Sequence, residues 1–521
     1  MICRRHITAG FIIGASLSVV VALLPSGCRD SESTTEPKAR CERDSDCRQG
    51  QVCADAVCID ASGGQLADAP PPTSDARSDG VAHEAPHRPW TWRRGGPGLP
   101  LSATVRGPSA APEVVWEQPL GAAISASPRL LTRDGEVHAC VGAHQGRFVC
   151  VVVEGARAGT LALDLQLDGI VWGTAAVGPG PNDGVRLYVG TDADTLHAID
   201  PASGAILWSR RLGRCEPPRA LGPMGVRCDV DGGPTVASDG GLLVGADGVY
   251  RVERDGAVTW RFDGAPAEPS ESSDDEATNQ KTKTQKKSKK KTKKTSKKKT
   301  GDEEEDLPPA KIEHVFAAPL ITASGDIVVG TQGAGLISLD PEGRERWRVE
   351  LVGDVDSAPA LGRDGSIYVG DDGGRLVAVS ARGQVRWTAD VGGPVRSAVT
   401  LDLRSSKGKR ARAPKETERI YVTTLAGSLH AFNRSGASLW SLEIGAPIQA
   451  TPAVDGEGTL FFGAQDERLY AVTRAGDVRW RIDLPEDVDS SVAISPGGRL
   501  VFGADDGMLR AVADPSAPVD R

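Results

Sequence analysis

The chain lacks most of the short patterns that identify enzymes and metal sites. No G-x-S-x-G phrase, no phosphate-binding glycine loop and no pair of adjacent cysteines occurs in it. The Asp, Asn and Glu residues form no cluster with the spacing of calcium ligands, which must supply several convergent oxygen atoms. The histidines show no C-x-x-C-H spacing and, apart from His83 and His87 in "HEAPH", no H-x-x-x-H spacing; they are His6, His83, His87, His138, His144, His197, His314 and His430. These absences favour a non-catalytic protein over an enzyme, with no metal site expected.

The sequence does contain a repeated segment of about forty residues. "DSAPALGRDGSIYVGDDGGRLVAVSARGQVRW" at 356–387 returns as "QATPAVDGEGTLFFGAQDERLYAVTRAGDVRW" at 449–480. Short apolar runs are separated by glycine-containing turns, which is typical of strands joined by tight hairpins. Each copy therefore predicts a four-stranded antiparallel meander, and neighbouring copies must stack because one meander alone leaves both faces uncovered.

The number of copies predicts the architecture. The opening phrase recurs at Pro128, Ala175, Pro234, Pro319, Pro359, Val399, Pro452 and Val492. With two polar insertions removed, the closing tryptophans repeat with a period of about forty residues, which is typical of propeller blades. The last copy lacks its closing strand, whereas "PEVVWEQPL" near the start is a closing strand with no copy before it. We therefore expect an all-β fold, an eight-bladed β-propeller of four-stranded antiparallel blades that the N-terminal strand closes.

The repeats resemble those of the pyrroloquinoline-quinone-like (PQQ-like) β-propeller family. "AIDPASGAILW", ending at Trp208, matches the family's tryptophan-docking phrase A-x-D-x-x-x-G-x-x-x-W, and "SLDPEGRERW", "AFNRSGASLW" and "AVTRAGDVRW" are shortened forms. "HRPWTWRRGGPG", with Trp90 and Trp92, resembles the segment before the first blade. The resemblance implies a structural role, with indoles wedged between blades, for Trp116, Trp208, Trp260, Trp347, Trp387, Trp440 and Trp480.

Two groups within this family imply different functions. Quinoprotein dehydrogenases hold PQQ and calcium, whereas the outer-membrane-assembly (BamB-like) lipoprotein propellers are non-enzymatic and eight-bladed. The missing adjacent-cysteine pair favours the second group, to which the resemblance is closer. We therefore expect a non-catalytic, monomeric binding or scaffold module without a cofactor, whose partner is an envelope or outer-membrane protein. A quinoprotein dehydrogenase or quinone-binding protein that uses PQQ and calcium is the alternative.

The N-terminus predicts export and a lipid anchor. Arg4 and Arg5 precede an apolar stretch over 7–24, and the small residues Ser26 and Gly27 precede Cys28. This order resembles a bacterial lipoprotein signal, which implies a signal peptide at 1–27 and a lipidated Cys28; an uncleaved membrane anchor is the alternative. Arg29 after the cysteine resembles retention at the outer membrane, so we expect a lipid-anchored envelope protein, with the side of the membrane left open.

The remaining cysteines suit an oxidising compartment. Residues 28–58 form a cysteine-rich segment in which two disulfides of open connectivity are expected, with zinc binding as the rival interpretation; its cysteines are Cys41, Cys47, Cys53 and Cys58. Cys140 and Cys150 flank a predicted hairpin symmetrically, and Cys215 and Cys228 bracket an insertion, so each pair predicts one disulfide. Residues 59–89 are rich in Pro, Ala, Ser and Asp and predict a flexible linker.

The propeller is expected to occupy 90–521, with a disordered acidic and lysine-rich insertion at 264–312. Residues 281–299 hold twelve lysines between acidic flanks, "SESSDDE" and "GDEEED". A nucleic-acid-binding arm is disfavoured because the flanks largely neutralise the charge, no aromatic residue interleaves and the compartment is outside the cytoplasm. A solvated loop, either inert or touching anionic lipid or polysaccharide, is favoured. The rest of the chain is acidic, which favours basic partners.

Aligning the eight opening phrases predicts a binding surface at the channel mouth. One aligned position holds only small residues, as expected for strands that crowd a narrow axis. Two residues earlier, on the same strand face, lie the candidate channel-mouth residues Ser125, Trp172, Asp231, Phe316, Asp356, Arg396, Gln449 and Asp489. Their mixture of aromatic, acidic and basic side chains suits recognition, with solvated strand ends as the alternative. In an up-and-down propeller the Lys tract shares this face, whereas "KGKRAR" projects from the opposite face.

Overall fold

In this computed structural model, the described residues are 51–54, 57–60, 105–180, 184–213, 228–264, 311–403, 405–406, 415–416 and 418–515. The chain forms two compact units, Met1–Ala61 and Ser62–Arg521. In the first unit, β1 (Gln51–Ala54) pairs antiparallel with β2 (Val57–Asp60), and Cys53 lies opposite Cys58. Several predictions fall outside the described residues: the signal peptide, lipidation at Cys28, the Cys41 and Cys47 pairings, Trp90 and Trp92, Cys215, "KGKRAR", and nearly all of the linker and of the insertion at 264–312.

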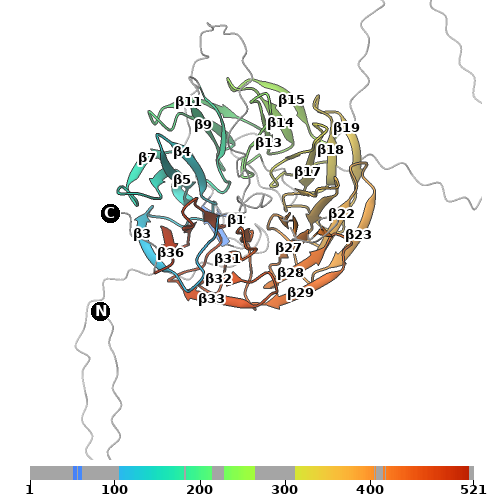
Figure 1. Cartoon of the computed structure of the whole chain (residues 1–521). Coiled ribbons are helices and arrows are strands. Elements are labelled where there is room, and N and C mark those ends of the chain that lie inside the picture. The colour runs from blue at the N-terminus through green and yellow to red at the C-terminus, as the bar shows by residue number, and fades with distance from the viewer. Residues whose placement is uncertain are drawn as a thin grey trace, which may run out of the picture. The chain divides into compact units, whose positions relative to one another are not determined.

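The second unit is an eight-bladed propeller of four-stranded antiparallel sheets. Figure 1 shows the blades arranged around a central axis. Blade 1 contains β4 (Arg129–Arg133), β5 (Glu136–Gly142), β6 (Arg147–Val152) and β7 (Leu161–Gln166). Blade 2 contains β8 (Ala176–Pro179), β9 (Val185–Gly190), β10 (Thr195–Ile199) and β11 (Ile206–Arg211). Blade 3 contains β12 (Thr235–Val236), β13 (Leu242–Gly245), β14 (Val249–Val252) and β15 (Val258–Phe262).

The following blades repeat this up-and-down order. Blade 4 contains β16 (Leu320–Ile321), β17 (Ile327–Thr331), β18 (Gly335–Leu339) and β19 (Glu345–Val349). Blade 5 contains β20 (Ala360–Leu361), β21 (Ile367–Gly370), β22 (Arg375–Val379) and β23 (Val385–Asp390). Blade 6 contains β24 (Thr400–Asp402), β27 (Arg419–Thr423), β28 (Ser428–Asn433) and β29 (Ser438–Glu443). Blade 7 contains β30 (Ala453–Val454), β31 (Leu460–Ala464), β32 (Arg468–Val472) and β33 (Val478–Asp483).

The N-terminal strand closes the ring, as the sequence predicts. Blade 8 contains β34 (Ala493–Ile494), β35 (Leu500–Gly503) and β36 (Met508–Ala513), and its outermost strand is β3 (Glu113–Pro119) from the start of the propeller. β3 runs antiparallel to β36, with Glu113 opposite Ala513 and Pro119 opposite Met508. Arg510 of β36 strengthens this pairing, because its guanidinium donates to Glu117 Oε1 at 2.6 Å and to Asp506. The first and last blades are therefore joined without a free strand between them.

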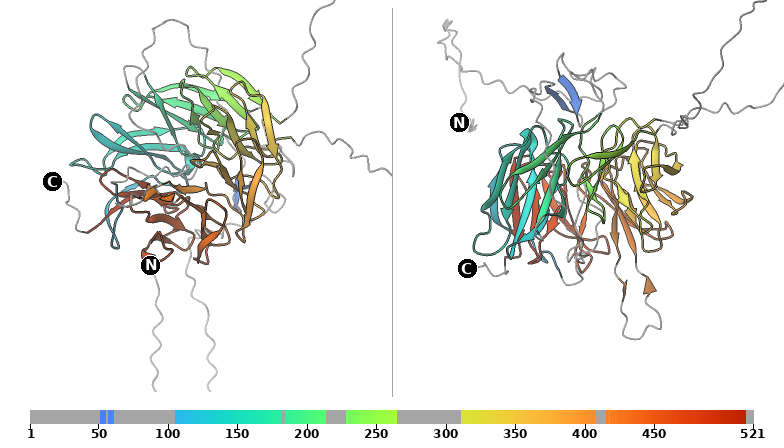
Figure 2. Two further views of the ribbon diagram at one scale, coloured as in Figure 1. Left: turned by 45° about the vertical axis from the view of Figure 1, so that its right-hand side comes forward. Right: turned by 90° about the horizontal axis from the view of Figure 1, so that it is seen from above.

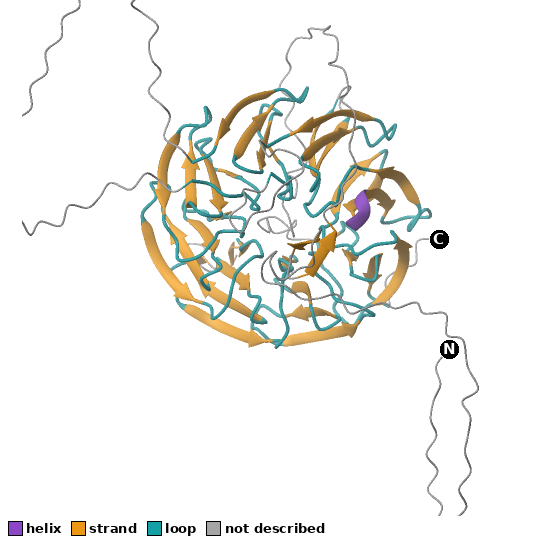
Figure 3. Ribbon diagram, turned by 180° about the vertical axis from the view of Figure 1, so that it is seen from behind, coloured by secondary structure: helices purple, strands orange, loops and turns teal. Residues whose placement is uncertain are grey.

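Strands account for nearly all regular structure in the described residues, and the single helix found there is the one-turn 3-10 helix η2 (His144–Gly146; Figure 3). None of the described helices is long and apolar enough to cross a membrane. A two-stranded ribbon, β25 (Ser405–Ser406) paired with β26 (Lys415–Glu416), extends the β24–β27 connection away from the ring (Figure 2, right). The insertion at 264–312 starts and ends on the other face, because Ile312 bonds to Asp263 and Glu313 bonds to Gln332 in the β17–β18 hairpin. The described ends of both insertions thus lie on opposite faces, as predicted.

Seven tryptophans each tie one blade to the next, at every junction of the ring except that between blades 1 and 2. Each indole Nε1 donates a hydrogen bond to a backbone carbonyl of the following blade or of the segment that completes it. The pairs are Trp116 with Val153, Trp208 with Arg254, Trp260 with Pro341, Trp347 with Ala381, Trp387 with Arg434, Trp440 with Arg474 and Trp480 with Pro108. These indoles act as structural wedges, since a buried indole ring adds a large apolar contact to the hydrogen bond.

The glycine in the repeated phrase is required where an indole docks. Gly436 lies in the β28–β29 turn with φ of 85°, a left-handed conformation that strains other residues. A Cβ at this position would approach Trp387 Cδ2 to 2.6 Å. Both the turn and the docked ring therefore exclude a side chain, which explains why the phrase keeps a glycine before each tryptophan.

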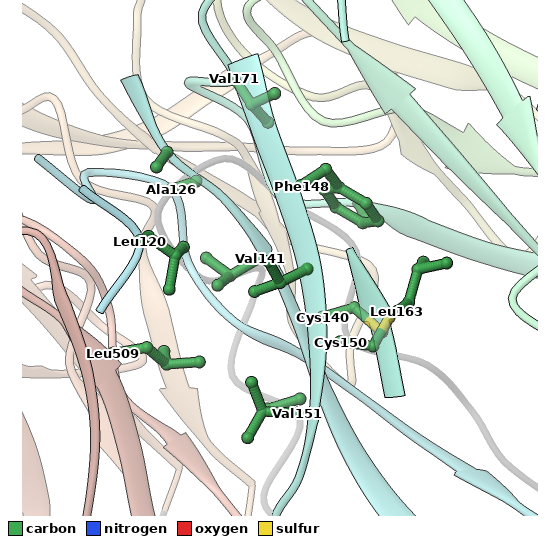
Figure 4. Close-up of a cluster of buried hydrophobic side chains, with 14 of the residues drawn as sticks. Leu120, Ala126, Cys140, Val141, Phe148, Cys150, Val151, Leu163, Val171 and Leu509 are labelled. Atoms are coloured by element: carbon green, nitrogen blue, oxygen red, sulfur yellow. A yellow bond between two sulfur atoms is a disulfide. The ribbon is translucent and has the colours of Figure 1, made fainter. Parts of the chain in front are cut away.

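Blade 1 departs from the pattern of the other blades. Blades 2, 5, 6 and 7 pair an aromatic ring of the second strand with the tryptophan of the fourth, as in Tyr188 and Trp208, whose ring centroids are 6.0 Å apart. In blade 1 the matching register positions hold Cys140, Cys150 and Leu163. Cys140 and Cys150 form a disulfide with their Cα atoms 4.0 Å apart (Figure 4). The predicted bridge is thus present, and it occupies the place of an aromatic side chain between blades 1 and 2.

Small hydroxyl side chains link the innermost strands around part of the ring. The backbone N–H of Ala398 donates to Thr451 Oγ1 at 2.9 Å, and that of Thr451 donates to Ser491 Oγ at 2.9 Å. The N–H of Ser491 continues the series to Ser127 Oγ at 3.1 Å. These residues occupy the aligned small-residue position, so their size allows close approach and their hydroxyls join blades 6, 7, 8 and 1.

Candidate functional site: the channel mouth

The predicted channel-mouth residues lie on the face that carries the hairpins between the second and third strands. Each hairpin of one blade meets the segment that leads into the next blade. In blade 5, for example, Asp371 O accepts a backbone hydrogen bond from Val395, directly before Arg396. The same bond recurs between Thr331 and Val355 and between Ala464 and Val488. The aligned residues are therefore held at the junctions between blades.

Side chains from the hairpins complete these junctions. Gln332 Nε2 donates to Asp356 Oδ1 at 3.1 Å, and Gln465 Nε2 donates to Asp489 Oδ1 at 3.1 Å. The Arg396 guanidinium lies 2.9 Å from Asp372 Oδ2, which is again a hairpin residue. The mouth is thus formed by two alternating sets, the predicted residues and the hairpin residues of the preceding blades.

Two further contacts join predicted residues to each other. Arg396 Nε lies 3.8 Å from Asp356 Oδ2, and Gln449 Nε2 donates to Asp489 Oδ2 at 3.0 Å. These contacts connect blades 5 with 6 and 7 with 8. Asp356 and Asp489 do not behave as solvated strand ends, since the side chain of Asp356 is 11% exposed and Asp489 is 7% exposed.

The other half of the mouth is aromatic. Ser125 Oγ contacts His144 Nε2 at 3.2 Å, and the His144 ring lies 4.3 Å from the Trp172 ring. In blade 4, the rings of His314 and Phe316 are 4.1 Å apart in an edge-to-face arrangement. Asp231 is also buried, and it belongs to blade 3, which lies between the blades of Trp172 and Phe316. The mouth therefore combines an aromatic half with an acid- and amide-rich half.

Sequence reasoning missed the hairpin residues. His144, Gln332, Asp372 and Gln465 each lie two residues after the glycine that ends the second strand, in "VGAH", "VGTQ", "VGDD" and "FGAQ". Aligning the repeats at this glycine would have shown a second variable position. The contacts of this second position with the next blade could not be predicted from the sequence, because the alternation of side chains along a strand describes one blade and not the angle between two blades.

Carboxylates dominate the face around the mouth. The hairpins and lead-in segments bring together Asp192, Asp231, Asp247, Asp354, Asp356, Asp372, Asp487, Asp489 and Asp505. Burial and the nearby carboxylates of Glu467, Glu486 and Asp466 raise the pKa of Asp487 above its ordinary value. Burial is the largest cause of this shift, and the part contributed by the three carboxylates indicates a negative potential around Asp487.

The mouth does not supply a set of ligands for calcium. In the described part of the chain, no group of three or more His, Cys, Asp or Glu residues is placed to hold a metal ion. The carboxylates of Asp356, Asp372 and Asp489 are instead directed at amide or guanidinium groups. The described mouth residues therefore show no set of several convergent oxygen atoms of the kind that calcium requires.

An eight-bladed ring with docked tryptophans and a polar channel mouth defines a PQQ-like propeller. The family model described as outer membrane protein assembly factor BamB matches residues 157–283, 332–407 and 425–516, which is more than half of the chain. The chain belongs to this family.

Solved structures show the same fold at low sequence identity. The crystal structure of BamB from Moraxella catarrhalis is 15% identical, with a TM-score of 0.50, and the match covers 77% of this chain and all of that one (100%). The computationally designed protein Ika8 is 14% identical, with a TM-score of 0.50 and coverage of 77% and 99%. A europium-containing methanol dehydrogenase is 12% identical, with a TM-score of 0.52 and coverage of 75% and 85%. No curated protein matches the chain.

Proposed function

We propose that the chain is a non-catalytic, exported lipoprotein that acts as a binding or scaffold module of the cell envelope, in outer-membrane protein assembly. Membership of the BamB family supports the envelope role. The signal-like N-terminus with Cys28 supports anchoring of a monomeric propeller by lipid at the outer membrane. The observation that carries the proposal is the acidic mouth, whose polar side chains are oriented by contacts between blades.

This mouth suits a basic segment of an envelope or outer-membrane protein. Its carboxylates are already held by neighbouring blades, so binding requires little additional ordering of side chains. The aromatic half, with Trp172 and Phe316, offers surfaces on which an arginine side chain stacks favourably. No cofactor is needed for this kind of recognition.

A crosslinked pull-down of the native lipoprotein, with mass spectrometry of the partners, tests the proposal. Asp356→Asn with Asp489→Asn removes two charges from the mouth while retaining hydrogen-bonding groups. We expect this variant to lose most of the crosslinked partner. A matched control, Asp134→Asn with Glu342→Gln, removes two exposed charges from the opposite face, where the side chains are 85% and 63% exposed, and is expected to retain it. Equal recovery with both variants would contradict a role for the mouth.

Anchoring is tested separately. Cys28→Ala is expected to leave an unprocessed precursor, because the lipid acceptor is missing. An unchanged size of the protein in this variant and under inhibition of the lipoprotein signal peptidase would contradict the lipoprotein assignment.

The likeness in fold to the methanol dehydrogenase favours one second candidate, a PQQ- and calcium-dependent dehydrogenase. We expect the purified protein to show no reduction of an artificial electron acceptor with alcohols or sugars when PQQ and calcium are added. Robust turnover would replace the scaffold proposal with this one. A saturable spectral change without turnover would indicate a quinone-binding module.

A further inference from the structure

Three side chains form a continuous hydrogen-bonded chain at blade 2. Asp168, in the segment between β7 and β8, contacts His197 Nε2 through Oδ1 at 2.8 Å. His197 Nδ1 contacts Ser209 Oγ at 2.8 Å across the β10–β11 pair, in which the two residues lie directly opposite each other. Trp208 is directed at blade 3, so strand alternation directs its neighbour Ser209 to the other side of the sheet, toward blade 1. The hydrogen-bonded series thus runs from the segment that leads into blade 2, through β10, to Ser209 on the outermost strand β11, and it contains none of the aligned mouth residues.

The hydrogen-bonding partners assign the tautomer of the neutral imidazole. An ionised carboxylate only accepts hydrogen bonds, so His197 Nε2 carries the proton that is shared with Asp168. In the neutral ring, Nδ1 then holds a lone pair and accepts the Ser209 hydroxyl proton. Burial raises the pKa of Asp168, but hydrogen bonds from His197 and Thr191 outweigh burial, so the pKa lies below its ordinary value and the carboxylate stays ionised.

The three side chains differ in exposure: Asp168 and His197 are buried, and the Ser209 residue is exposed. The side chains of His197 and Asp168 are 4% and 9% exposed, whereas Ser209 is exposed. Arg211 follows two residues later on the same face of β11, opposite Thr195, and its guanidinium is 54% exposed beside Asp194. Arg211 is the cationic side chain next to Ser209 on this face of β11, and its guanidinium is held by Asp194.

Blade 6 provides an internal comparison. His430 and Ser441 lie opposite each other there, in the register that His197 and Ser209 have in blade 2. His430 Nε2, however, contacts Ser428 Oγ at 2.8 Å, and the position that corresponds to Asp168 is Gly392. Among the residues that the structure describes, only blade 2 joins the histidine–serine pair to a carboxylate.

We propose that the ring carries an ester-cleaving site in addition to its scaffold role, and that it is therefore not purely non-catalytic. Ser209 is a base-activated nucleophile for carboxylic esters, with His197 as the general base and Asp168 as the residue that positions it. Ser209 Oγ forms a bond to the carbonyl carbon while its proton moves to His197 Nδ1. The ester C–O bond then breaks, and the proton passes to the departing alcohol oxygen, leaving an acyl-serine. Water, deprotonated by His197, releases the acid and restores the hydroxyl. Serine proteases use the same relay with the two ring nitrogens exchanged.

Labelling with a fluorophosphonate, read by intact mass and peptide mapping, tests this nucleophile in the full-length protein. We expect one adduct on Ser209 and a burst of p-nitrophenol from p-nitrophenyl butyrate that is stoichiometric with protein. Ser209→Ala should abolish both signals. Asp168→Asn keeps a hydrogen-bonding group at the same place and should slow labelling about a hundredfold or more, as expected when general-base assistance is lost.

Ser441→Ala is the matched control, since it removes the equivalent hydroxyl of blade 6, and labelling should be unchanged. Thermal unfolding of each variant shows whether it is folded. The proposal is overturned if the wild-type protein carries no adduct on Ser209, or if a folded Asp168→Asn variant is labelled at the wild-type rate. Either result would leave the envelope scaffold proposal standing, because the mouth shares no residue with this site.

Discussion

Arg129 is the largest fully buried side chain of the ring and begins the innermost strand of blade 1. Its Nε and Nη1 atoms have no hydrogen-bond partner. At the equivalent position, the hydroxyls of Thr235 and Thr400 donate to carbonyl oxygens of the next blade, at Pro319 and Pro452. Arg129 therefore lies between blades 1 and 2, where neighbouring blades place small polar or apolar side chains. Burial lowers its pKa to about 9.

We expect Arg129→Met to stabilise the protein at neutral pH, because it removes a buried charge and keeps the apolar volume. The free energy of unfolding should rise by about 1–4 kcal/mol. In the wild-type protein, stability should also rise with pH above about 9, since the unfolded chain then binds more protons than the folded one. Chemical denaturation against pH measures both effects.

The control is Arg157→Met, which alters an exposed ion pair with Glu136 and should change stability by about 0–1 kcal/mol. A loss of stability in Arg129→Met would mean that the guanidinium has an anionic partner in the folded protein.

At the scale of elements, the seam between blades 1 and 2 holds a cystine and a leucine where four other blades hold an aromatic pair. In blade 2 the corresponding seam contains Tyr188, Ala198 and Trp208, and the turn glycine of the next blade contacts the indole. In blade 1, Gly204 of the next blade meets Leu163 instead, with Cδ1 3.2 Å from the position of a Cβ. A covalent bond thus compensates for the smaller apolar contact of leucine.

Replacing Cys140 and Cys150 by alanine should therefore lower stability more than the loss of two sulfur atoms implies. Closing a loop of this size contributes about 2–3 kcal/mol by restricting the unfolded chain. Denaturant unfolding under oxidising conditions, beside peptide mapping without reduction, measures the effect. Identical midpoints for the variant and the wild-type protein would contradict the stabilising role.

Blade 8 depends on pairing between residues that are far apart in the sequence. Arg510→Met removes the guanidinium that joins β36 to Glu117 of β3 and to Asp506, and should cost about 1.5–3 kcal/mol. Burial raises the pKa of Asp506, but its hydrogen bonds to Arg510 outweigh this and place the pKa below its ordinary value. This stabilisation is present above the unfolded pKa and is lost as the pH falls through the folded pKa.

The Arg510→Met variant should therefore have a lower free energy of unfolding, and this free energy should fall less steeply as the pH is lowered than in the wild-type protein. Arg481→Met, on an exposed position of the outer strand β33, serves as the control and should leave both unchanged. A wild-type acid profile in Arg510→Met would show that this ion pair does not contribute to closure.

The elements differ in how far the sequence predicts them. The repeat period, the missing final strand and the isolated strand around Trp116 predicted both the blade number and the closure by β3, because these features are local and periodic. The alignment also predicted one set of mouth residues. The alignment did not predict the hairpin partners Gln332, Asp372 and Gln465, nor the contact of Asp168 with His197. These contacts depend on how neighbouring segments pack, and the spacing of residues within one blade does not encode that packing.

For the whole molecule, the two faces differ in the groups they present. One face carries the mouth with its carboxylates, and the segment 264–312 leaves and rejoins the ring there beside the β17–β18 hairpin. Deleting 270–306 removes twelve lysines together with the nine acidic residues of their flanks, and it removes none of the described residues that pack the blades.

We expect this deletion to leave thermal unfolding unchanged and to alter the association rate with a basic partner. The partner should bind somewhat faster and with a slightly steeper dependence on salt, because the deleted segment carries twelve lysines and nine acidic residues, so the acidic ring loses a net positive charge. Stopped-flow binding at several ionic strengths measures this. The control is deletion of "KGKRAR", the basic segment between β25 and β26, which leave the ring on the opposite face. Equal salt dependence in all three proteins would exclude an electrostatic contribution of the tract.

The route of the chain into the ring has a mechanical consequence. Val105 bonds to Gly456 in the β30–β31 turn, and Ser109 and Ala110 bond to Asp514, all on the face opposite the mouth, before β3 runs the height of blade 8. A pull on the chain upstream of Val105, with a partner holding the mouth, acts along β3 and parallel to β36. The hydrogen bonds from Glu113 to Pro119 are then loaded together in shear and do not open one after another. A ring tethered in this way resists tension along the same strand that completes its fold.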